Sequence, residues 1–423
     1  MRRATALCSA LVALALASCE SQLGSVAAAG AAGMGGDRAI EAGGAGSPPA
    51  AAAGESTARA GGGASANTAG SSGSANSAGS EAAGSAGASD DSCGSTSIGE
   101  LEVYLSSSNW DPLGYPPYAV DDCTLVYVAA GSDAGALHVR NLATGVDEVL
   151  ETAQTKPRRP TVSGALIAWE ADGANGSELH VRVDGNIETV SGAFVRAEEP
   201  RATDDAVVFT AFLGPNPNDD SDVYLFDART GELSAIATGP GQQRFADVSP
   251  THVAFTDFSE DPRGYFDEMG SVSDVAIVER ASGQRSNRSS PGKQAFPLLG
   301  DNGVFAYLEW AAIHPEPKLG QFWLKAGRLD RPVSEDYNVK TTGQVTTNPA
   351  YVRPSLRGLK LDFIDQGSEG LALYRTLLSA PDTLIASKIA GSTQLFGPVA
   401  GERFTLLANQ RSAQSLALLA VPR

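Results

Sequence analysis

The sequence predicts an all-β protein, a seven-bladed β-propeller that follows a disordered N-terminal stalk. Two observations support this prediction. Every Phe, Tyr and Trp of the chain lies after residue 93, so the preceding residues cannot build a packed core. From residue 118 onward, one pattern of short alternating apolar and polar segments recurs seven times.

Each copy of the pattern has a short segment, a tight polar turn and two longer segments in which apolar residues alternate, as in Val223–Phe226. The copies begin at Tyr118, Pro160, Pro200, Ala246, Pro297, Tyr351 and Pro398. Their spacing of roughly 40–55 residues is typical of four-stranded propeller blades. Copies five and six match the pattern least well, so six or eight blades are the alternatives.

The two ends of the domain are expected to close the ring together. The last copy ends at Arg423 after its third strand, so it lacks a fourth. A strand-like segment at Gly99–Leu105 precedes the first copy and belongs to none. We expect this segment to supply the missing strand, because a closed ring leaves no long exposed sheet edge.

The N-terminus has the features of a secretory signal peptide. Arg2 and Arg3 precede an apolar run at 7–16, which is too short to span a membrane. Leu16-Ala17-Ser18-Cys19 resembles a bacterial lipobox. The resemblance implies a signal peptide at 1–18 and lipidation of Cys19, which would anchor the protein to a membrane. Glu20 follows this cysteine. An Asp at that position would favour retention in the inner membrane, so Glu20 favours the outer membrane. The alternative is an ordinary signal peptide with a chance cysteine.

The next segment, residues 19–92, is expected to be a disordered linker. It consists almost entirely of Ala, Gly and Ser, and such a chain buries too little apolar surface to offset the entropy of ordering. We interpret it as a tether between the lipid and a domain at 93–423. A low-complexity site for a partner is the alternative.

Two cysteines remain for the domain, because Cys8 belongs to the signal peptide and Cys19 to the anchor. Cys93 and Cys123 are expected to form one disulfide in an oxidising compartment. Two free thiols are the alternative.

The chain is acidic, with a formal net charge of −18. Phosphate contacts require a basic face, so a nucleic-acid partner is not expected. The expected partners are the membrane, through the lipid anchor, and an envelope protein or glycan. The protein itself is expected to be a monomer.

The repeats resemble those of TolB-type, WD40-like propellers. The resemblance rests on Ser249-Pro250 before His252–Phe255, on Ser163-Gly164 before Leu166–Trp169, and on Asp222–Asp227 before Thr230-Gly231-Glu232. It covers about residues 98–423 and implies the fold. The α/β domain that precedes the TolB propeller has no counterpart here, so the role of TolB with its partner Pal is not implied.

No linear motif of a catalytic or metal site is apparent. The four histidines lack ligand spacing, and His138 and His180 recur at one place in copies one and two, which indicates ordinary packing or hydrogen bonding. Acidic pairs such as Asp121-Asp122 fall in turns, where Asp commonly bonds to the backbone. A pair of glycosidase carboxylates is the alternative interpretation.

The segment Asn216–Asp222 is rich in oxygen ligands, but it lacks the glycine placement and final Glu of an EF-hand loop. We interpret it as a solvated loop. A Ca²⁺ site is the alternative, and no other cofactor is expected.

The loops between the second and third strands are long in copies three, four and five, at 213–221, 259–272 and 311–320. These copies are consecutive, so the three loops should form one continuous surface, which we call the long-loop wall. Binding residues commonly lie on such loops. The predicted binding residues are Asp219, Asp220, Asp261, Tyr265, Phe266, Trp310 and His314. Neutral variation in loop length is the alternative.

Together these features predict a lipoprotein of the cell envelope whose propeller binds a protein or a glycan. A carbohydrate-active enzyme, either lyase or hydrolase, is the first alternative, because propeller active sites take single residues from several blades and leave no linear motif. A structural envelope component is the second alternative.

Overall fold

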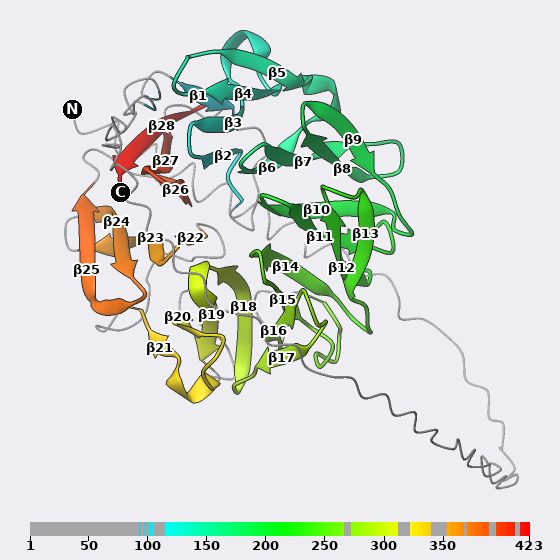
Figure 1. The fold of residues 1–423 in the computed structure, drawn as a ribbon, viewed down its shortest axis with the longest axis vertical. Helices are drawn as coiled ribbons and strands as arrows, with labels where there is room; N and C mark the ends of the chain where they lie inside the picture. The colour runs from blue at the N-terminus through cyan, green and yellow to red at the C-terminus, as the bar shows by residue number, and fades with distance from the viewer. Residues whose placement is uncertain are drawn as a thin grey trace, which may run out of the picture. The chain divides into compact units, whose positions relative to one another are not determined.

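The computed structural model describes Cys93, Ile98 and residues 101–104, 115–265, 272–311, 322–339, 353–367, 370–388, 395–410 and 415–423. The predicted signal peptide, Cys19 and the predicted linker lie outside these residues. The described part is a seven-bladed β-propeller, as predicted: its strands form seven four-stranded antiparallel sheets, which Figure 1 shows arranged around a common centre. No helix in the described part is long and apolar enough to cross a membrane.

The first strand of each sheet lies nearest the centre, and consecutive first strands contact one another around the ring. They are β2 (Tyr118–Asp121), β6 (Arg158–Ser163), β10 (Arg196–Thr203), β14 (Gln243–Val248), β18 (Gly292–Leu299), β22 (Ser355–Arg357) and β26 (Leu395–Ala400).

The second strands are β3 (Thr124–Val128), β7 (Leu166–Asp172), β11 (Ala206–Phe212), β15 (His252–Asp257), β19 (Val304–Ala311), β23 (Lys360–Gly367) and β27 (Phe404–Gln410). The third strands are β4 (Leu137–Asn141), β8 (Ser177–Val183), β12 (Ser221–Asp227), β16 (Asp274–Glu279), β20 (Phe322–Arg328), β24 (Gly370–Leu377) and β28 (Ser415–Pro422).

The outer strands are β5 (Asp147–Glu151), β9 (Asn186–Val190), β13 (Glu232–Ala237), β17 (Arg285–Arg288), β21 (Tyr337–Asn338), β25 (Ala380–Lys388) and β1 (Glu102–Tyr104). Four short 3₁₀ helices occur in the described connections, at Gly131–Asp133, Ala153–Thr155, Asp301–Gly303 and Val333–Glu335.

The ring closes as the sequence predicted. Strand β1 is the outer strand of the seventh sheet, where it pairs antiparallel with β28 in the register Val103↔Leu416. Val103 also forms a bridge to Ala129, just beyond β3 of the first blade. One short segment therefore completes the last blade and joins it to the first.

The apolar core lies between neighbouring sheets. Trp169 of β7 is fully buried and packs in one cluster with Val126 and Val128 of β3, so blade 2 covers blade 1. Phe255 of β15 packs in the same way with Val208 of β11. The second strands are buried at consecutive positions, as in β11 and β7, because both faces of each sheet meet a neighbouring blade.

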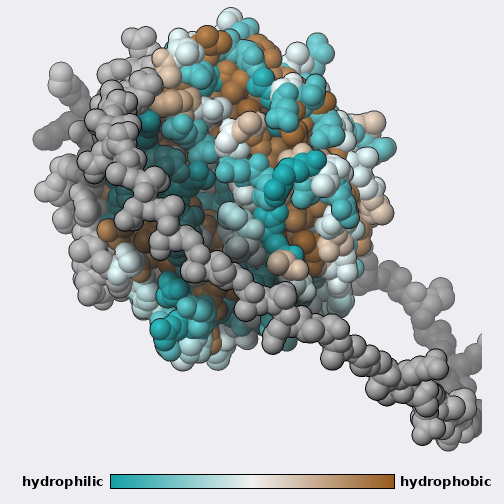
Figure 2. Space-filling view, viewed as in Figure 1, coloured by the Kyte–Doolittle hydropathy of each residue, from teal (hydrophilic) through white to brown (hydrophobic). Residues whose placement is uncertain are grey.

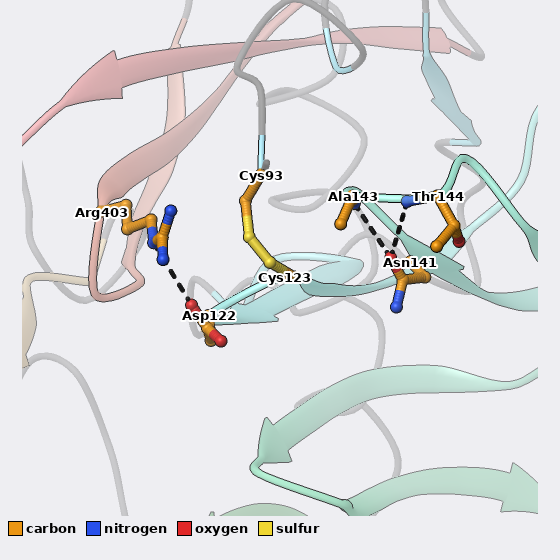
Figure 3. The surroundings of a disulfide bond; sticks show 7 residues. All are labelled: Cys93, Asp122, Cys123, Asn141, Ala143, Thr144 and Arg403. Atoms are coloured by element: carbon orange, nitrogen blue, oxygen red, sulfur yellow. Dashed lines mark hydrogen bonds and ion pairs between the residues drawn. A yellow bond between two sulfur atoms is a disulfide. The ribbon is translucent and has the colours of Figure 1, made fainter. Parts of the chain in front are cut away.

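A disulfide joins Cys93 to Cys123 in the turn between β2 and β3 (Figure 3). The two Cα atoms lie 5.3 Å apart. In the same turn, Asp122 forms an ion pair with Arg403 of the seventh blade, at 3.5 Å. The disulfide therefore fastens the start of the domain close to the junction between the first and last blades.

Candidate functional site

Several of the first strands share a β-bulge near the centre of the ring. Their pairing with the second strands shifts register in β6, β10, β14 and β18. The residue just inside each shift has a positive φ: Arg159 (48°), Glu199 (63°), Phe245 (56°) and Phe296 (57°). We call these four residues, together with Arg353 ahead of β22, the axial layer. A proline follows in four of the five cases. Its missing N–H is tolerated at a bulge, where the ladder is interrupted.

Three backbone amides of the axial layer donate hydrogen bonds to the preceding blade. The amide of Glu199 donates to Glu170 Oε1 at 2.6 Å, and the amide of Phe245 donates to Glu199 Oε2 at 3.1 Å. The amide of Phe296 donates to Thr256 Oγ1 at 3.0 Å. At each of these bulges, the backbone amide does not pair within its own sheet. It donates to a side chain of the preceding blade and so joins the two blades.

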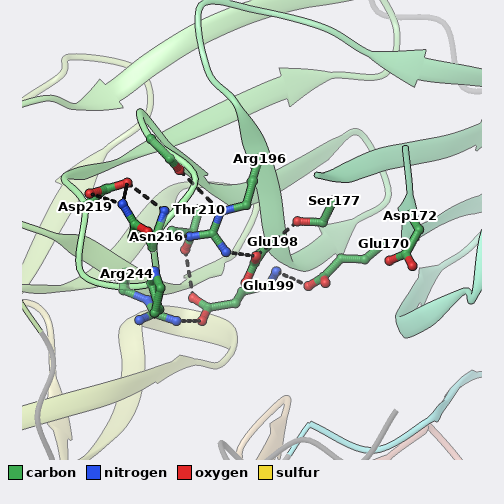
Figure 4. Close-up of polar contacts among 12 residues, drawn as sticks. Glu170, Asp172, Ser177, Arg196, Glu198, Glu199, Thr210, Asn216, Asp219 and Arg244 are labelled. Carbon is green, nitrogen blue, oxygen red and sulfur yellow. Dashed lines mark hydrogen bonds and ion pairs between the residues drawn. The ribbon is translucent and has the colours of Figure 1, made fainter. Parts of the chain in front are cut away.

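Charged side chains surround the axial layer in blades 2 to 4 (Figure 4). Arg159 bridges two glutamates, with its Nη1 atom 2.7 Å from Glu170 Oε1 and 3.3 Å from Glu198 Oε2. Arg244 pairs with Glu199 at 2.5 Å, and Thr210 donates a further hydrogen bond to the same carboxylate at 2.8 Å. Both Glu170 and Glu199 are fully buried.

The pKa values of the two buried glutamates shift in opposite directions. Burial raises the pKa of Glu170 to about 7, against the opposing effects of Arg159 and Arg158. Burial also acts to raise the pKa of Glu199, but Arg244 and Arg159 outweigh it and lower that pKa to about 2. Glu199 is therefore held as an anion, whereas Glu170 gains a proton near neutral pH.

An arginine–aromatic stack fills the centre itself. The guanidinium of Arg353 lies 3.8 Å from the ring centre of Tyr115 and 4.4 Å from that of Phe296. Tyr115 also faces Arg201 and Arg159, whose guanidinium carbons lie 5.0 and 5.2 Å from its ring centre. Such contacts are favourable cation–π interactions. Arg353 and Tyr115 are 4% and 5% exposed, so the stack closes the axis at this level. Figure 2 shows hydrophilic residues gathered in the hollow at the centre of the face.

A cavity of about 220 Å³ lies where the first and second strands of the blades turn. Six blades contribute to it, and its charged lining is Asp204, Asp247, Asp301, Glu402 and Arg357. Burial raises the pKa of Asp247 despite the lowering effect of Arg201. A second cavity, of about 400 Å³, lies between blades 1 and 2 and includes Arg182 and Glu148, which pair at 2.6 Å.

The long-loop wall lies at the opposite end of the sheets from the 220 Å³ cavity. Successive strands are antiparallel, so loops between second and third strands emerge at the other end from turns between first and second strands. In the first loop of the wall, Asp219 accepts a hydrogen bond from the amide of Asn216 at 2.7 Å, and Asp220 is exposed.

Two buried or half-buried side chains hold this loop in place. Arg196 of β10 bonds to Glu198 at 2.6 Å and to the carbonyl of Asn216 at 2.9 Å. Gln242 is fully buried, and its Nε2 atom donates to the carbonyls of Pro217 (2.7 Å) and Asp219 (3.0 Å).

The second loop of the wall also contacts Gln242. The backbone N–H of Gln242 donates to the carbonyl of Gly264 at 2.6 Å. Asp261 is 6% exposed and accepts hydrogen bonds from the amides of Arg263 (2.8 Å) and Val272 (2.6 Å). Tyr265 is half-buried, with Arg263 over its ring.

The remaining predicted wall residues stay as predictions. Phe266 and His314 lie outside the described residues. Trp310 is described only as a member of β19, where it pairs with Lys293 and Phe322. The first two loops are thus brought together by Gln242, and the third is not described.

The histidines of the first two blades take part in local hydrogen bonds. His138 Nδ1 lies 3.1 Å from Asp147, and His180 Nδ1 lies 3.0 Å from Glu151. Each ring also packs against an aromatic residue, Tyr127 or Trp169. Among the described residues, one group has suitable spacing for a metal ion, Cys93, Asp122 and Cys123, and the disulfide occupies both of its sulfurs.

Sequence reasoning missed the axial layer, although a signal for it was present. The residues before the starts of copies two, three and five are Arg159, Glu199 and Phe296, each followed by proline. A repeated X-Pro step at the start of a first strand indicates a bulge, and two charged residues at that step indicate a polar axis. Gln242 gave no such signal, because its role depends on two loops that approach it only in the fold.

No family model matches the chain, and no curated protein matches it. Among solved structures, it is similar to the β-propeller domain of the Trilobed protease from Pyrococcus furiosus, with 11% identity over 76% of this chain and 93% of that one, and a TM-score of 0.54. A structure from a study of two prolyl endopeptidases matches at 12% identity over 78% and 52% of the chains, with a TM-score of 0.52.

TolB from Acinetobacter baumannii is also among the similar structures, at 12% identity, 77% and 68% coverage and a TM-score of 0.41. At these identities a likeness concerns the fold alone. The β-propeller fold that the repeats predicted is confirmed at that level by the seven sheets and by the first two structures.

Proposed function

We propose that this protein is a lipid-anchored component of the cell envelope whose propeller binds a protein or a glycan at the long-loop wall. The observation that carries this proposal is the position of Gln242. Its side chain holds the loop of blade 3, and its backbone holds the loop of blade 4. Two loops on a rigid scaffold are thereby pre-organised side by side, which lowers the entropic cost of binding.

A carbohydrate-active enzyme is the competing proposal, and one observation favours it. Glu170 and Glu198 share Arg159, and their pKa values shift apart: burial raises that of Glu170, while Arg159 and Arg196 lower that of Glu198 against the effect of burial. Such pairs often divide acid and base roles. Glu170, however, has an exposed fraction of zero. A carboxyl group that cannot touch a substrate serves the packing of the blades, so we favour binding.

The envelope location rests on the lipobox-like Leu16-Ala17-Ser18-Cys19. Changing Cys19→Ala is expected to move the protein from the membrane fraction to the soluble fraction, with Ser18→Ala as a matched control that stays in membranes. If the Cys19→Ala protein remains in membranes, the lipid anchor is wrong.

Binding at the wall is tested by capture from native envelope extracts. Asp220 is exposed in the first loop, so Asp220→Lys reverses a charge without removing a contact within the domain. The expected result is that wild type captures a defined partner and Asp220→Lys captures less of it. The matched control is Asp184→Lys, in a turn of blade 2 beside the 400 Å³ cavity. Equal capture by all three proteins would contradict binding at this wall.

A further inference from the structure

The cavity of about 400 Å³ between blades 1 and 2 has an apolar side and a charged rim. Its apolar side is formed by Val139 of β4, by Val146 in the turn after β4 and by Ile167 of β7. We call these three residues the aliphatic side. At the rim, Arg182 of blade 2 and Glu148 of blade 1 form an ion pair at 2.6 Å. Apolar walls with a few polar groups are typical of ligand pockets, and this volume is sufficient for one side chain or a small molecule.

The neighbouring junction, between blades 2 and 3, shows which group fills this position elsewhere in the ring. Phe226 in β12 pairs with Val207, the second residue of β11. Arg182 in β8 pairs with Ile167, the second residue of β7, so Phe226 and Arg182 hold equivalent positions. Phe226 is 4% exposed and packs in one cluster with Leu166 of blade 2. Blade 3 thus places an aromatic ring against its neighbour where blade 2 places a guanidinium.

Two large apolar side chains are left exposed beside the cavity. Val146 lines it and is 63% exposed, and Ile187, which pairs with Arg182 in the sheet, is 47% exposed. In blade 3, Leu233 pairs with Phe226 in the same way but packs against its apolar cluster. The junction between blades 2 and 3 is therefore covered where the junction between blades 1 and 2 is open, and apolar groups gathered at an opening mark an interaction site.

The guanidinium of Arg182 indicates what kind of group would cover this opening. No aromatic residue is among the described residues that line the cavity. Elsewhere in the domain, guanidinium groups lie over rings: the guanidinium carbon of Arg196 is 4.1 Å from the ring centre of Phe212, and that of Arg288 is 4.8 Å from the ring centre of Phe305. Such stacking is favourable, because the planar cation is attracted to the face of the ring.

The charges at the rim select among aromatic rings. The side chain of Glu148 is 49% exposed, and Asp184 lies exposed in the turn after β8. The lining therefore carries two carboxylates and one guanidinium. A ring that bears a carboxylate would meet like charge here, whereas the N–H of tryptophan or the O–H of tyrosine can donate a hydrogen bond to a carboxylate.

We propose that this cavity binds a tryptophan or tyrosine side chain of a partner protein. The ring lies between the Arg182 guanidinium and the aliphatic side, and its polar hydrogen is donated to Glu148 or Asp184. The inference goes beyond binding at the long-loop wall. The cavity includes turns that join first to second strands and third to fourth strands, so it lies at the opposite end of the sheets and forms a second contact surface.

The test uses the purified full chain with methyl-labelled valine and isoleucine, titrated with end-blocked Gly-Trp-Gly and Gly-Tyr-Gly. Wild type is expected to bind at least one tripeptide with saturation. Its ring should move the methyl resonances of the aliphatic side upfield, because those methyl groups lie over the ring face. The matched probe carries cyclohexylalanine in place of the aromatic residue. It should bind roughly 3-fold or more weakly, because it lacks the attraction to a cation.

Arg182→Phe copies the arrangement of blade 3. Its ring is expected to occupy the cavity, so the variant should lose tripeptide binding and melt no lower than wild type. Arg182→Lys keeps a cation beside Glu148 but lacks the planar guanidinium, and it should bind roughly 3-fold more weakly. Arg140→Lys is the matched control. Arg140 holds the same position in blade 1, opposite the second residue of β3, and points away from the cavity because its neighbour Val139 lines it.

The inference is overturned if neither tripeptide binds with saturation, if the shifted methyl groups lie outside the aliphatic side, or if Arg182→Phe binds as wild type does. Should Arg182→Phe fail to fold, unchanged binding by Arg182→Lys overturns it. Equal binding of the cyclohexylalanine probe would contradict an aromatic ligand, and tighter binding of indole alone would contradict a partner protein. Partner capture at the long-loop wall is measured separately, so either proposal can fail while the other stands.

Discussion

The axial layer and the long-loop wall use carboxylates in opposite ways. At the axis, Glu170 and Glu199 are fully buried and each is held by arginine and by a backbone amide of the next blade. In the wall, Asp219 bonds within its own loop and Asp220 is exposed. Acidic residues of this propeller therefore occupy two settings, buried between blades at the axis or in a surface loop at the wall. Burial, rather than charge, separates the two roles.

The largest effect should come from breaking an axial ion pair. Glu199→Ala leaves the Arg244 guanidinium and the Phe245 amide buried without their acceptor. We expect a loss of about 3–5 kcal/mol in the free energy of unfolding, as for other buried pairs that lose one partner. Asp219→Ala, the matched change in the wall, should cost only about 1 kcal/mol. Urea unfolding measures both, and equal losses would show that the two regions do not differ.

The pH dependence should separate the two axial glutamates. Glu199 has a lowered pKa of about 2, so its contribution is present above the unfolded value near 4.5 and is lost as the pH falls towards 2. Glu170 has a raised pKa of about 7. As the pH rises, Glu170 loses its proton in the unfolded chain before it does so in the folded protein. The free energy of unfolding therefore declines between about pH 4.5 and about pH 7, by up to about 3 kcal/mol at 1.36 kcal/mol per pH unit.

Glu170→Gln should therefore remove the decline between about pH 4.5 and 7, while the loss at lower pH remains. The glutamine can still accept the hydrogen bond from the amide of Glu199. The measurement is the free energy of unfolding of both proteins from pH 3 to 8. Parallel pH curves for Glu170→Gln and wild type would contradict a raised pKa at this position.

The sequence predicted the propeller well because its signal is local and repeated. Alternating segments such as Val223–Phe226 and the turns between them recur in every blade, and the closing strand at Glu102–Tyr104 followed from counting strands. The axis could not be predicted in the same way. Arg353 meets Tyr115, Phe245 and Phe296 from three distant parts of the chain, and no single blade contains that arrangement.

Gln242 holds the wall loops and also accepts a hydrogen bond from Arg244 of the axial ion pair at 3.5 Å, so its loss should have an intermediate effect. Gln242→Ala removes the donor to the carbonyls of Pro217 and Asp219 and leaves them in a partly buried site. The expected cost is about 1–3 kcal/mol. Hydrogen exchange should show faster opening of residues 213–221 than of the axial strand β10. The exposed Gln284→Ala is the matched control and should behave as wild type. Uniformly faster exchange throughout the domain would indicate that Gln242 supports the whole fold instead.

The smallest effect on stability, with the clearest effect on binding, is expected at Asp220. The side chain is exposed, so Asp220→Ala should change the free energy of unfolding by less than about 0.5 kcal/mol. If the wall binds a partner, the same change should weaken capture, because only residues that remain available can contact that partner. Glu232→Ala, exposed on the outer strand of the same blade, should alter neither property. A variant at Asp220 that unfolds more readily yet captures its partner normally would reverse the roles assigned to the wall and the axis.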